Sequence, residues 1–178
     1  MPTSDERWND VMAIYLDDCA CGTTVEGNVF IRAGRAMMIG GGRDNIVRHN
    51  VFVDCTPALH VDARGTGWGK VHFDGDWEIK RRFAEVPWQS PPWKRRYPAL
   101  ARYWHEHPYE PRGNRIERNI CVGGTWKELN DGLTDTTAGI GVNLLNPPPG
   151  VVDPVTGRVD LSPGSPARRM GFTPLPEK

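Results

Sequence analysis

The chain repeats a short phrase of apolar residues at intervals of about two dozen positions. Three copies begin 23 and 22 residues apart, namely AIYLD at 13–17, AMMIG at 36–40 and ALHVD at 58–62. A second phrase occurs as VEGNVF at 25–30, VRHNVF at 47–52 and IERNIC at 116–121. A period in the twenties built from short strands is typical of a solenoid, in which each turn of the chain packs on its neighbours.

Two solenoid classes share this period. Leucine-rich repeats need a regular leucine scaffold that this chain lacks, and the Gly, Asn and Asp residues between its phrases favour turns between strands. The pattern therefore predicts an all-β fold, a parallel β-helix. Each strand would pair with its equivalent one turn along, about 4.8 Å away, so that equivalent side chains stack in columns.

Three columns follow from the second phrase. The two apolar columns would contain Val29, Val51 and Ile120, and Phe30, Phe52 and Cys121. The third would be a ladder of amides at a corner, formed by Asn28, Asn50 and Asn119. Stacked amides can bond one another and the backbone, so we expect the ladder to be structural.

The composition restricts the function classes. The formal net charge is zero, which gives no reason to expect nucleic acid or an anionic membrane as a partner, and no apolar run approaches the roughly 20 residues that span a bilayer. Cys55 and Cys121 are expected to be small core residues. Cys19 and Cys21 are too close in sequence to bridge each other easily, and without a CxxC pair we expect no structural zinc site.

The length predicts one domain over residues 1–178. Because a complete coil begins by Ala13 without an amphipathic capping segment before it, we expect this domain to be the C-terminal part of a longer solenoid. Its first coil, residues 13–35, would present an open strand edge through which the chain could self-associate. The final segment, 146–178, is too rich in proline for coil strands and is expected to pack back on the solenoid.

The periodicity is lost in an insertion at 66–112 that contains five of the seven tryptophans. Short helices are predicted within 76–86 and 99–106. The insertion could be a cap whose aromatic residues form a small satellite core, and exposed rings on the same cap could stack on sugars. The five tryptophans are Trp68, Trp77, Trp88, Trp93 and Trp104.

Polar residues follow the first phrase at equivalent positions. Stacking would align Asp17, Gly40, Asp62 and Asn143, just after the outward residues Tyr15, Met38, His60 and Gly141. Asp17 and Asp62 would be two turns apart, roughly 9 to 10 Å between backbones, and their carboxyl groups could flank a glycosidic bond as acid and as base or nucleophile. Asp18 is an equal candidate for the role of Asp17.

Each candidate also has a structural explanation. Asp17 and Asp18 begin a bend, where Asp often bonds its own backbone, and Arg43 beside Asp44 could shape a turn. His60, Asp62 and Arg64 could form a surface ion-pair cluster. A calcium site at Asp17 and Asp18 is conceivable, but no calcium-binding signature supports it.

Several segments resemble glycoside hydrolase family 141. They are AIYLDD at 13–18, IGGGRDN at 39–45, NVFVDC at 50–55, HVDARG at 60–65, PWKRRYPAL at 92–100, SPA at 165–167 and GF at 171–172. The resemblance implies a right-handed parallel β-helix and a secreted or periplasmic parent enzyme, with fucosidase or xylanase activity on plant-type polysaccharides. It also implies catalysis by paired Asp residues, here Asp62 with Asp17 or Asp18. The chain departs from the family in lacking the preceding coils.

Three functions remain open. Hydrolysis of a polysaccharide would use Asp17, Asp18 and Asp62, without a cofactor. A polysaccharide lyase would instead abstract a proton beside a uronate carboxylate, making Arg43, Arg64 and His60 central and calcium a candidate cofactor. The third is a non-catalytic glycan-binding or structural solenoid. In the enzymatic readings the candidate substrate-binding residues are Tyr15, His60, Arg43, Arg64, Trp68 and Trp93.

Overall fold

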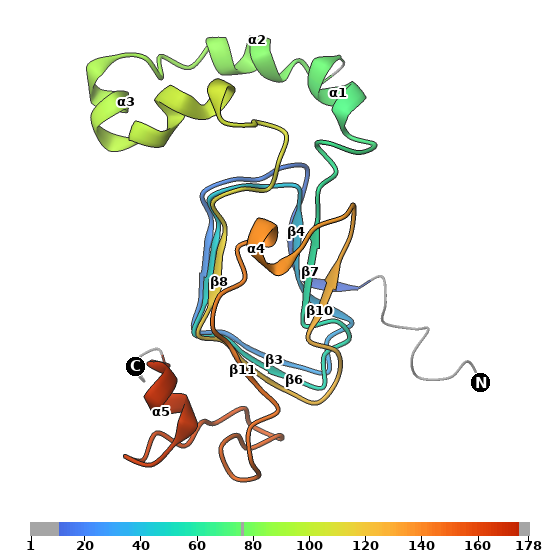
Figure 1. The fold of residues 1–178 in the computed structure, drawn as a ribbon, viewed down its shortest axis with the longest axis vertical. Coiled ribbons are helices and arrows are strands. Elements are labelled where there is room, and N and C mark those ends of the chain that lie inside the picture. The colour runs from blue at the N-terminus through green and yellow to red at the C-terminus, as the bar shows by residue number, and fades with distance from the viewer. Residues whose placement is uncertain (1–10, 76, 175–178) are drawn as a thin grey trace, which may run out of the picture.

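The computed structural model describes residues 11–75 and 77–174, which form three parallel sheets that the chain visits in turn. Seen end-on, successive turns lie over one another with a nearly rectangular outline (Figure 1). The first two turns contain β1 (Met12–Leu16), β2 (Thr24–Glu26), β3 (Val29–Ile31), β4 (Arg35–Gly40), β5 (Ile46–Arg48) and β6 (Val51–Val53). The later strands are β7 (Leu59–Asp62), β8 (Arg115–Glu117), β9 (Ile120–Val122), β10 (Lys127–Leu129) and β11 (Leu144–Leu145).

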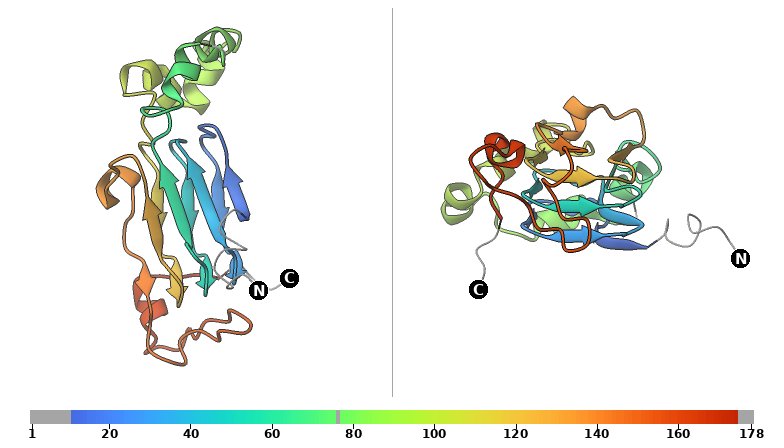
Figure 2. Two further views of the ribbon diagram at one scale, coloured as in Figure 1. Left: turned by 90° about the vertical axis from the view of Figure 1, so that its right-hand side faces the viewer. Right: turned by 90° about the horizontal axis from the view of Figure 1, so that it is seen from below.

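The sheets are ordered as the sequence repeat requires. Their strand orders are β1-β4-β7-β10, β2-β5-β8 and β3-β6-β9-β11, so β1, β2 and β3 are edge strands within the described part of the chain. Figure 2 shows the strands of successive turns side by side. The register pairs Leu16 with Ile39 and Ile39 with Val61, which confirms the predicted stacking of the first phrase.

The columns of the second phrase are also confirmed. Val29 pairs with Val51 and Val51 with Ile120, while Phe30, Phe52 and Cys121 pair in the same way. The rings of Phe30 and Phe52 stack with centroids 5.0 Å apart. Because alternate side chains of a strand point to opposite faces, the Phe and Cys column lies in the core inside the coil.

The asparagine ladder is present and longer than predicted. The side-chain oxygen of Asn50 accepts from the backbone and side-chain nitrogens of Asn28, and Asn119 accepts from Asn50 in the same way. Asn143 then accepts from Asn119. The prediction that Asn143 stacks with Asp17, Gly40 and Asp62 is therefore wrong. The segment before Asn143 lies beside β8, where Ile140 bridges to Ile116, and not beside β10.

The corner that carries this ladder needs an unusual backbone. The residues before the first three asparagines, Gly27, His49 and Arg118, have φ angles of 71°, 56° and 56°. Non-glycine residues rarely adopt positive φ. The hydrogen bonds between the asparagine side chains stabilise this backbone conformation at His49 and Arg118.

The insertion follows β7 and precedes β8 in the sequence, and it projects from one side of the stacked turns (Figures 1 and 2). Its helices are α1 (Lys70–Asp74), α2 (Ile79–Ala84), α3 (Pro91–Arg96) and the 3-10 helix η1 (Pro98–His105). The helices predicted within 76–86 and 99–106 correspond to α2 and η1, although residue 76 lies outside the described part; α1 and α3 were not predicted. The ring of Phe83 contacts those of Trp88, Tyr103 and Trp104.

The last segment covers the outer face of the β3-β6-β9-β11 sheet. After the short helix α4 (Asp135–Ala138), the chain forms an irregular tail with α5 (Pro166–Met170). Val152 and Phe172 from this tail are buried in one cluster with Val53 and Ile120 from the sheet. No helix in residues 11–75 and 77–174 has the length and apolar character that crossing a bilayer requires.

Candidate functional site

Three strand ends of the β1-β4-β7-β10 sheet form the candidate site. Asp17 directly follows β1, Gly40 ends β4 and Asp62 ends β7. Gly40 pairs with Asp62 across the parallel sheet, and Leu16 pairs with Ile39. Because parallel strands end at one edge of a sheet, Asp17 and Asp62 lie on either side of Gly40, as the repeat predicts.

The guanidinium of Arg64 joins these acids. Arg64 Nη2 donates to Asp62 Oδ2 at 2.8 Å, and Nε donates to Asp62 Oδ1 at 3.0 Å. Nη1 donates to Asp17 Oδ1 at 2.8 Å, to Asp18 Oδ1 at 3.1 Å and to the Tyr15 hydroxyl at 3.0 Å. One buried cation thus links three carboxylates and a phenol, with a fork that binds Asp62 through two nitrogens.

Gly40 and two aromatic rings make room for this cation. A Cβ at Gly40 would lie only 2.4 Å from Arg64 Cζ, so the guanidinium fits against Gly40 because glycine has no side chain there. Arg64 Cζ lies 5.6 Å from the ring centroid of Tyr15 and 5.4 Å from that of Trp68. Cation–π contacts of this kind favour the charged form of the side chain.

The acids beside Arg64 are held in the ionised form. Burial raises the pKa of Asp62, but the nearby His60 imidazole and the hydrogen bonds from Arg64 outweigh this effect and set the pKa at about 2. Burial also opposes ionisation of Asp17, yet bonds from Tyr15, the Asp18 backbone and Arg64 leave its pKa below the usual value. Both carboxylates are charged at neutral pH, so they suit a base, a nucleophile or a hydrogen-bond acceptor and not a proton donor.

His60 extends the cluster along the sheet. Its Nε2 lies 3.8 Å from Asp62 Oδ2, and its Nδ1 lies 3.4 Å from Glu128 Oε2. Glu128 belongs to β10 and pairs in register with His60, so the fourth outward residue after Tyr15, Met38 and His60 is Glu128. The prediction that Gly141 holds this place is wrong, because β10 and not the segment at 139–143 continues the sheet.

The strand β10 has only a weak signature in the sequence. The segment Lys127–Leu129 lacks the alternating apolar pattern of β1, β4 and β7, and all three of its residues are only half-buried. The usable signal was Leu129, which pairs with Val61 of the core column. The sequence analysis therefore missed Glu128 as a neighbour of His60. It also missed Arg35, whose Nη2 lies 3.8 Å from Glu128 Oε2.

The outer layer of the cluster faces solvent. The side chains of Asp17 and Asp18 are 55% and 51% exposed, and Trp68 is 58% exposed. Asp62, Arg64 and His60 lie beneath them and are buried. A ligand reaching this surface would meet two carboxylates and an indole ring first.

Two of the predicted substrate-binding residues lie elsewhere. Arg43 and Trp93 line a separate pocket between the stack and the insertion, and none of the three acids lines it. Arg43 is itself buried, with Nε donating to Asp44 Oδ2 at 3.1 Å and Nη1 donating to the Glu106 carbonyl at 2.9 Å. The structure thus brings together Tyr15, Asp17, Asp18, His60, Asp62, Arg64 and Trp68, and separates Arg43 and Trp93 from them.

The cation that balances the acids is part of the protein. Within the described residues, no group of three or more His, Cys, Asp or Glu side chains is arranged to hold a metal ion. The oxygens of Asp17, Asp18 and Asp62 that converge here bind Arg64.

Comparisons with protein-family models, with curated proteins and with solved structures found no match to this chain. The resemblance to glycoside hydrolase family 141 therefore stays a prediction.

Proposed function

We propose that the chain is a right-handed parallel β-helix of a carbohydrate-active protein, and that its three-acid surface binds a polysaccharide. The observation that supports this best is the convergence of Asp17, Asp18 and Asp62 from two different turns beside an exposed Trp68. In a right-handed parallel β-helix, the three parallel sheets of this chain would be the three faces of one coil.

The chemistry of the surface suits a sugar chain. Ionised carboxylates accept hydrogen bonds from hydroxyl groups, and an indole face packs against the apolar face of a pyranose ring. Asp17 and Asp18 supply the acceptors and Trp68 supplies the ring. Since the strand ends succeed one another along the stack, an extended ligand could lie parallel to its axis.

Hydrolysis of a glycosidic bond is the reaction we propose for this site. The low pKa of Asp62 and the lowered pKa of Asp17 favour ionised roles for both, as base, nucleophile or charge stabiliser. Asp18 is an equal candidate with Asp17 for the carboxylate that acts together with Asp62. Arg64 would position Asp17 and Asp62 relative to each other.

The contacts of Arg64 favour hydrolysis over elimination. A lyase needs a cation that is available to bind the uronate carboxylate. Arg64 already binds three carboxylates of the protein, so it has little capacity for another. If the reaction is elimination, calcium is the cofactor we propose. For either reaction, we propose that the parent protein is periplasmic or extracellular.

A plant-glycan panel tests the binding proposal. We expect at least one oligosaccharide to bind, and Asp17→Asn, Asp18→Asn and Trp68→Ala each to weaken its binding by about tenfold, or about 1.4 kcal/mol. Asp160→Asn changes an exposed acid of the tail and serves as the matched control. Binding that is equal in all four variants would contradict the assigned surface.

Product analysis of the same panel distinguishes the reactions. Hydrolysis would produce new reducing ends without ultraviolet absorption, whereas elimination would leave an unsaturated sugar that absorbs. Asp62→Asn should abolish turnover while the protein remains folded. Oligosaccharide binding without turnover would instead identify a glycan-binding solenoid.

A further inference from the structure

A pocket lies between the stack and the helical insertion, away from the acids. Its volume is about 430 Å³, within the range of small-molecule sites. The bends of the first two turns form one wall and the insertion forms the other. The wall from the insertion contains Trp93, Tyr97, Pro98, Ala99, Leu100 and Tyr103.

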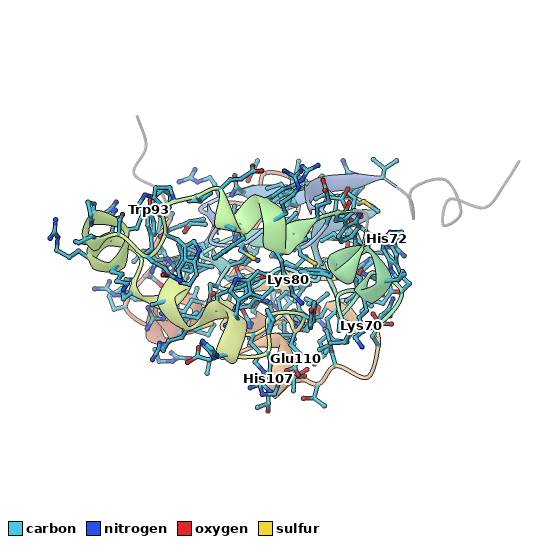
Figure 3. The ribbon with its side chains drawn as sticks, turned by 90° about the horizontal axis from the view of Figure 1, so that it is seen from above. Lys70, His72, Lys80, Trp93, His107 and Glu110 are labelled. Carbon is cyan, nitrogen blue, oxygen red and sulfur yellow. The ribbon has the colours of Figure 1, made fainter. Side chains whose placement is uncertain are left out.

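The position of this pocket is visible from above the insertion. Trp93 lies at one end of the helical segment, opposite the end that carries Lys70 and His72 (Figure 3). Trp68, which belongs to the acid cluster, contacts the ring of His72 at that other end. The two sites can therefore be altered independently.

The polar groups of the opposite wall are already engaged. Arg43 donates to Asp44 and to the Glu106 carbonyl, and its Cζ lies 5.3 Å from the ring centroid of Tyr103. Cys21 Sγ donates to the Cys19 carbonyl at 2.9 Å. A sugar has hydroxyl groups around its whole edge and would leave several of them without partners here, which is costly.

The lining suits a ligand with few hydrogen-bonding groups. Tyr103 donates its hydroxyl to the Pro108 carbonyl at 3.2 Å and its ring stacks on that of Phe83, so the ring is held in place beside Leu100 and Ala99. Trp93 and Tyr97 add two further rings with centroids 5.4 Å apart. Aromatic side chains arranged in this way favour a flat ring that can stack or meet them edge to face.

We propose that this pocket binds a planar monocyclic aromatic molecule, with its ring against Tyr103, Trp93 and Leu100. Arg43 and Asp44 pair on the stack wall, so their charges balance and the lining selects for the aromatic ring itself and not for a charge on it. This ligand class differs from the polysaccharide proposed for the acid cluster, and the inference does not depend on that function.

Titration with 4-hydroxycinnamate tests the proposal, with methyl β-xyloside as the comparison sugar. We expect saturable binding of the cinnamate, followed by calorimetry or by NMR of the tryptophan indole N–H groups, and none of the sugar. Leu100→Trp fills the pocket and should weaken binding at least about tenfold. Trp68→Ala, at the other site, should leave it unchanged.

The folded state is checked by circular dichroism and thermal unfolding. Should Leu100→Trp fail to fold, Ala99→Leu provides a smaller filling substitution with the same expected loss. Absence of saturable cinnamate binding, binding unaffected by pocket filling, or tighter binding of the xyloside would each overturn the proposal.

Discussion

The guanidinium of Arg64 lies against Gly40, at the place where any larger residue would put its Cβ. A Cβ built on Gly40 would be 2.4 Å from Arg64 Cζ and 2.6 Å from Nη2. These contacts are with the end of a flexible side chain and not with backbone. A methyl group at this position would therefore displace the arginine and leave the sheet intact.

Gly40→Ala is expected to uncouple Arg64 from the acids. Displacement of the guanidinium would weaken its bonds to Asp17 and Asp18 and lower the free energy of unfolding by about 1.5–3 kcal/mol, the range for hydrogen bonds to charged groups. Urea unfolding measures the change. Gly164→Ala is the control, because a Cβ at Gly164 meets nothing within 4 Å. Equal losses in both variants would show that Gly40 has no special relation to Arg64.

Arg64→Met is expected to destabilise the protein more strongly. It leaves the buried carboxylate of Asp62 without its counter-ion, and loss of one partner of a buried pair costs about 3–5 kcal/mol. Adding Asp62→Asn should recover part of this loss, since the unpaired charge is removed. A double-mutant cycle in urea measures the coupling. Arg81→Met, in the exposed pairs with Glu78 and Glu85, should change stability little.

Asp62 should also make stability depend on acid pH. Its pKa is about 2 in the folded protein and 3.8 in the reference state, so the unfolded chain takes up this proton first as the pH falls. The stabilisation is complete above pH 3.8 and is lost as the pH falls towards 2. Asp62→Asn should remove this component from the pH profile of the unfolding free energy. An unchanged slope between these pH values would contradict the assigned pKa.

The sequence predicted the stacked strands well because their physical cause is local. Alternating apolar residues at a fixed spacing determine both which side chains point inward and which strands pair. The same logic placed Asp17 and Asp62 around Gly40. It failed at Asn143, whose surrounding segment looked like a first-phrase strand, and at β10, where only Leu129 enters the core column.

The position of Arg64 could not be predicted from periodicity. If the strand had continued, Arg64 would have shared a face with His60 and Asp62, but β7 ends at Asp62. A turn follows, in which the nitrogens of Thr66 and Gly67 donate to the Ala63 carbonyl, while the Arg64 nitrogen donates to Asp62 Oδ1. This turn directs the guanidinium over Gly40 towards Asp17, a contact that depends on three-dimensional geometry.

Substitutions along the asparagine ladder should have unequal effects. Asn50 is fully buried, accepts from Asn28 and donates to Asn119, whereas Asn143 lies at the far end and is only half-buried. Asn50→Ala leaves the backbone nitrogen of Asn28 without its acceptor and should cost about 2–4 kcal/mol, the sum of two or three such bonds. Asn143→Ala should cost clearly less. Thermal and urea unfolding of both variants measure the difference, and equal costs would contradict the ladder as a cooperative element.

His49 should make docking of the tail depend on pH near neutrality. The Thr173 nitrogen donates to His49 Nδ1 at 3.1 Å, and Phe172 meets the His49 ring edge-on, so the contact needs the neutral imidazole. Burial lowers the pKa of His49 below 6.5, partly opposed by Glu26 and reinforced by Arg48. The undocked or unfolded state therefore takes up the proton first, and the stabilisation is complete above pH 6.5 and is lost as the pH falls below it.

Limited proteolysis of the tail between pH 7.5 and 5 measures this dependence. Cleavage in the tail should become faster as the pH falls, and a His49→Asn variant should lose much of the pH dependence because its amide does not titrate in this range. His107→Gln, which changes an exposed histidine of the insertion, is the matched control and should behave like the wild type. If cleavage accelerates equally in the His49→Asn variant, then the lowered pKa of His49 does not couple the tail to the sheet, and the attachment of the tail must be sought in its apolar cluster, to which Val152 and Phe172 belong.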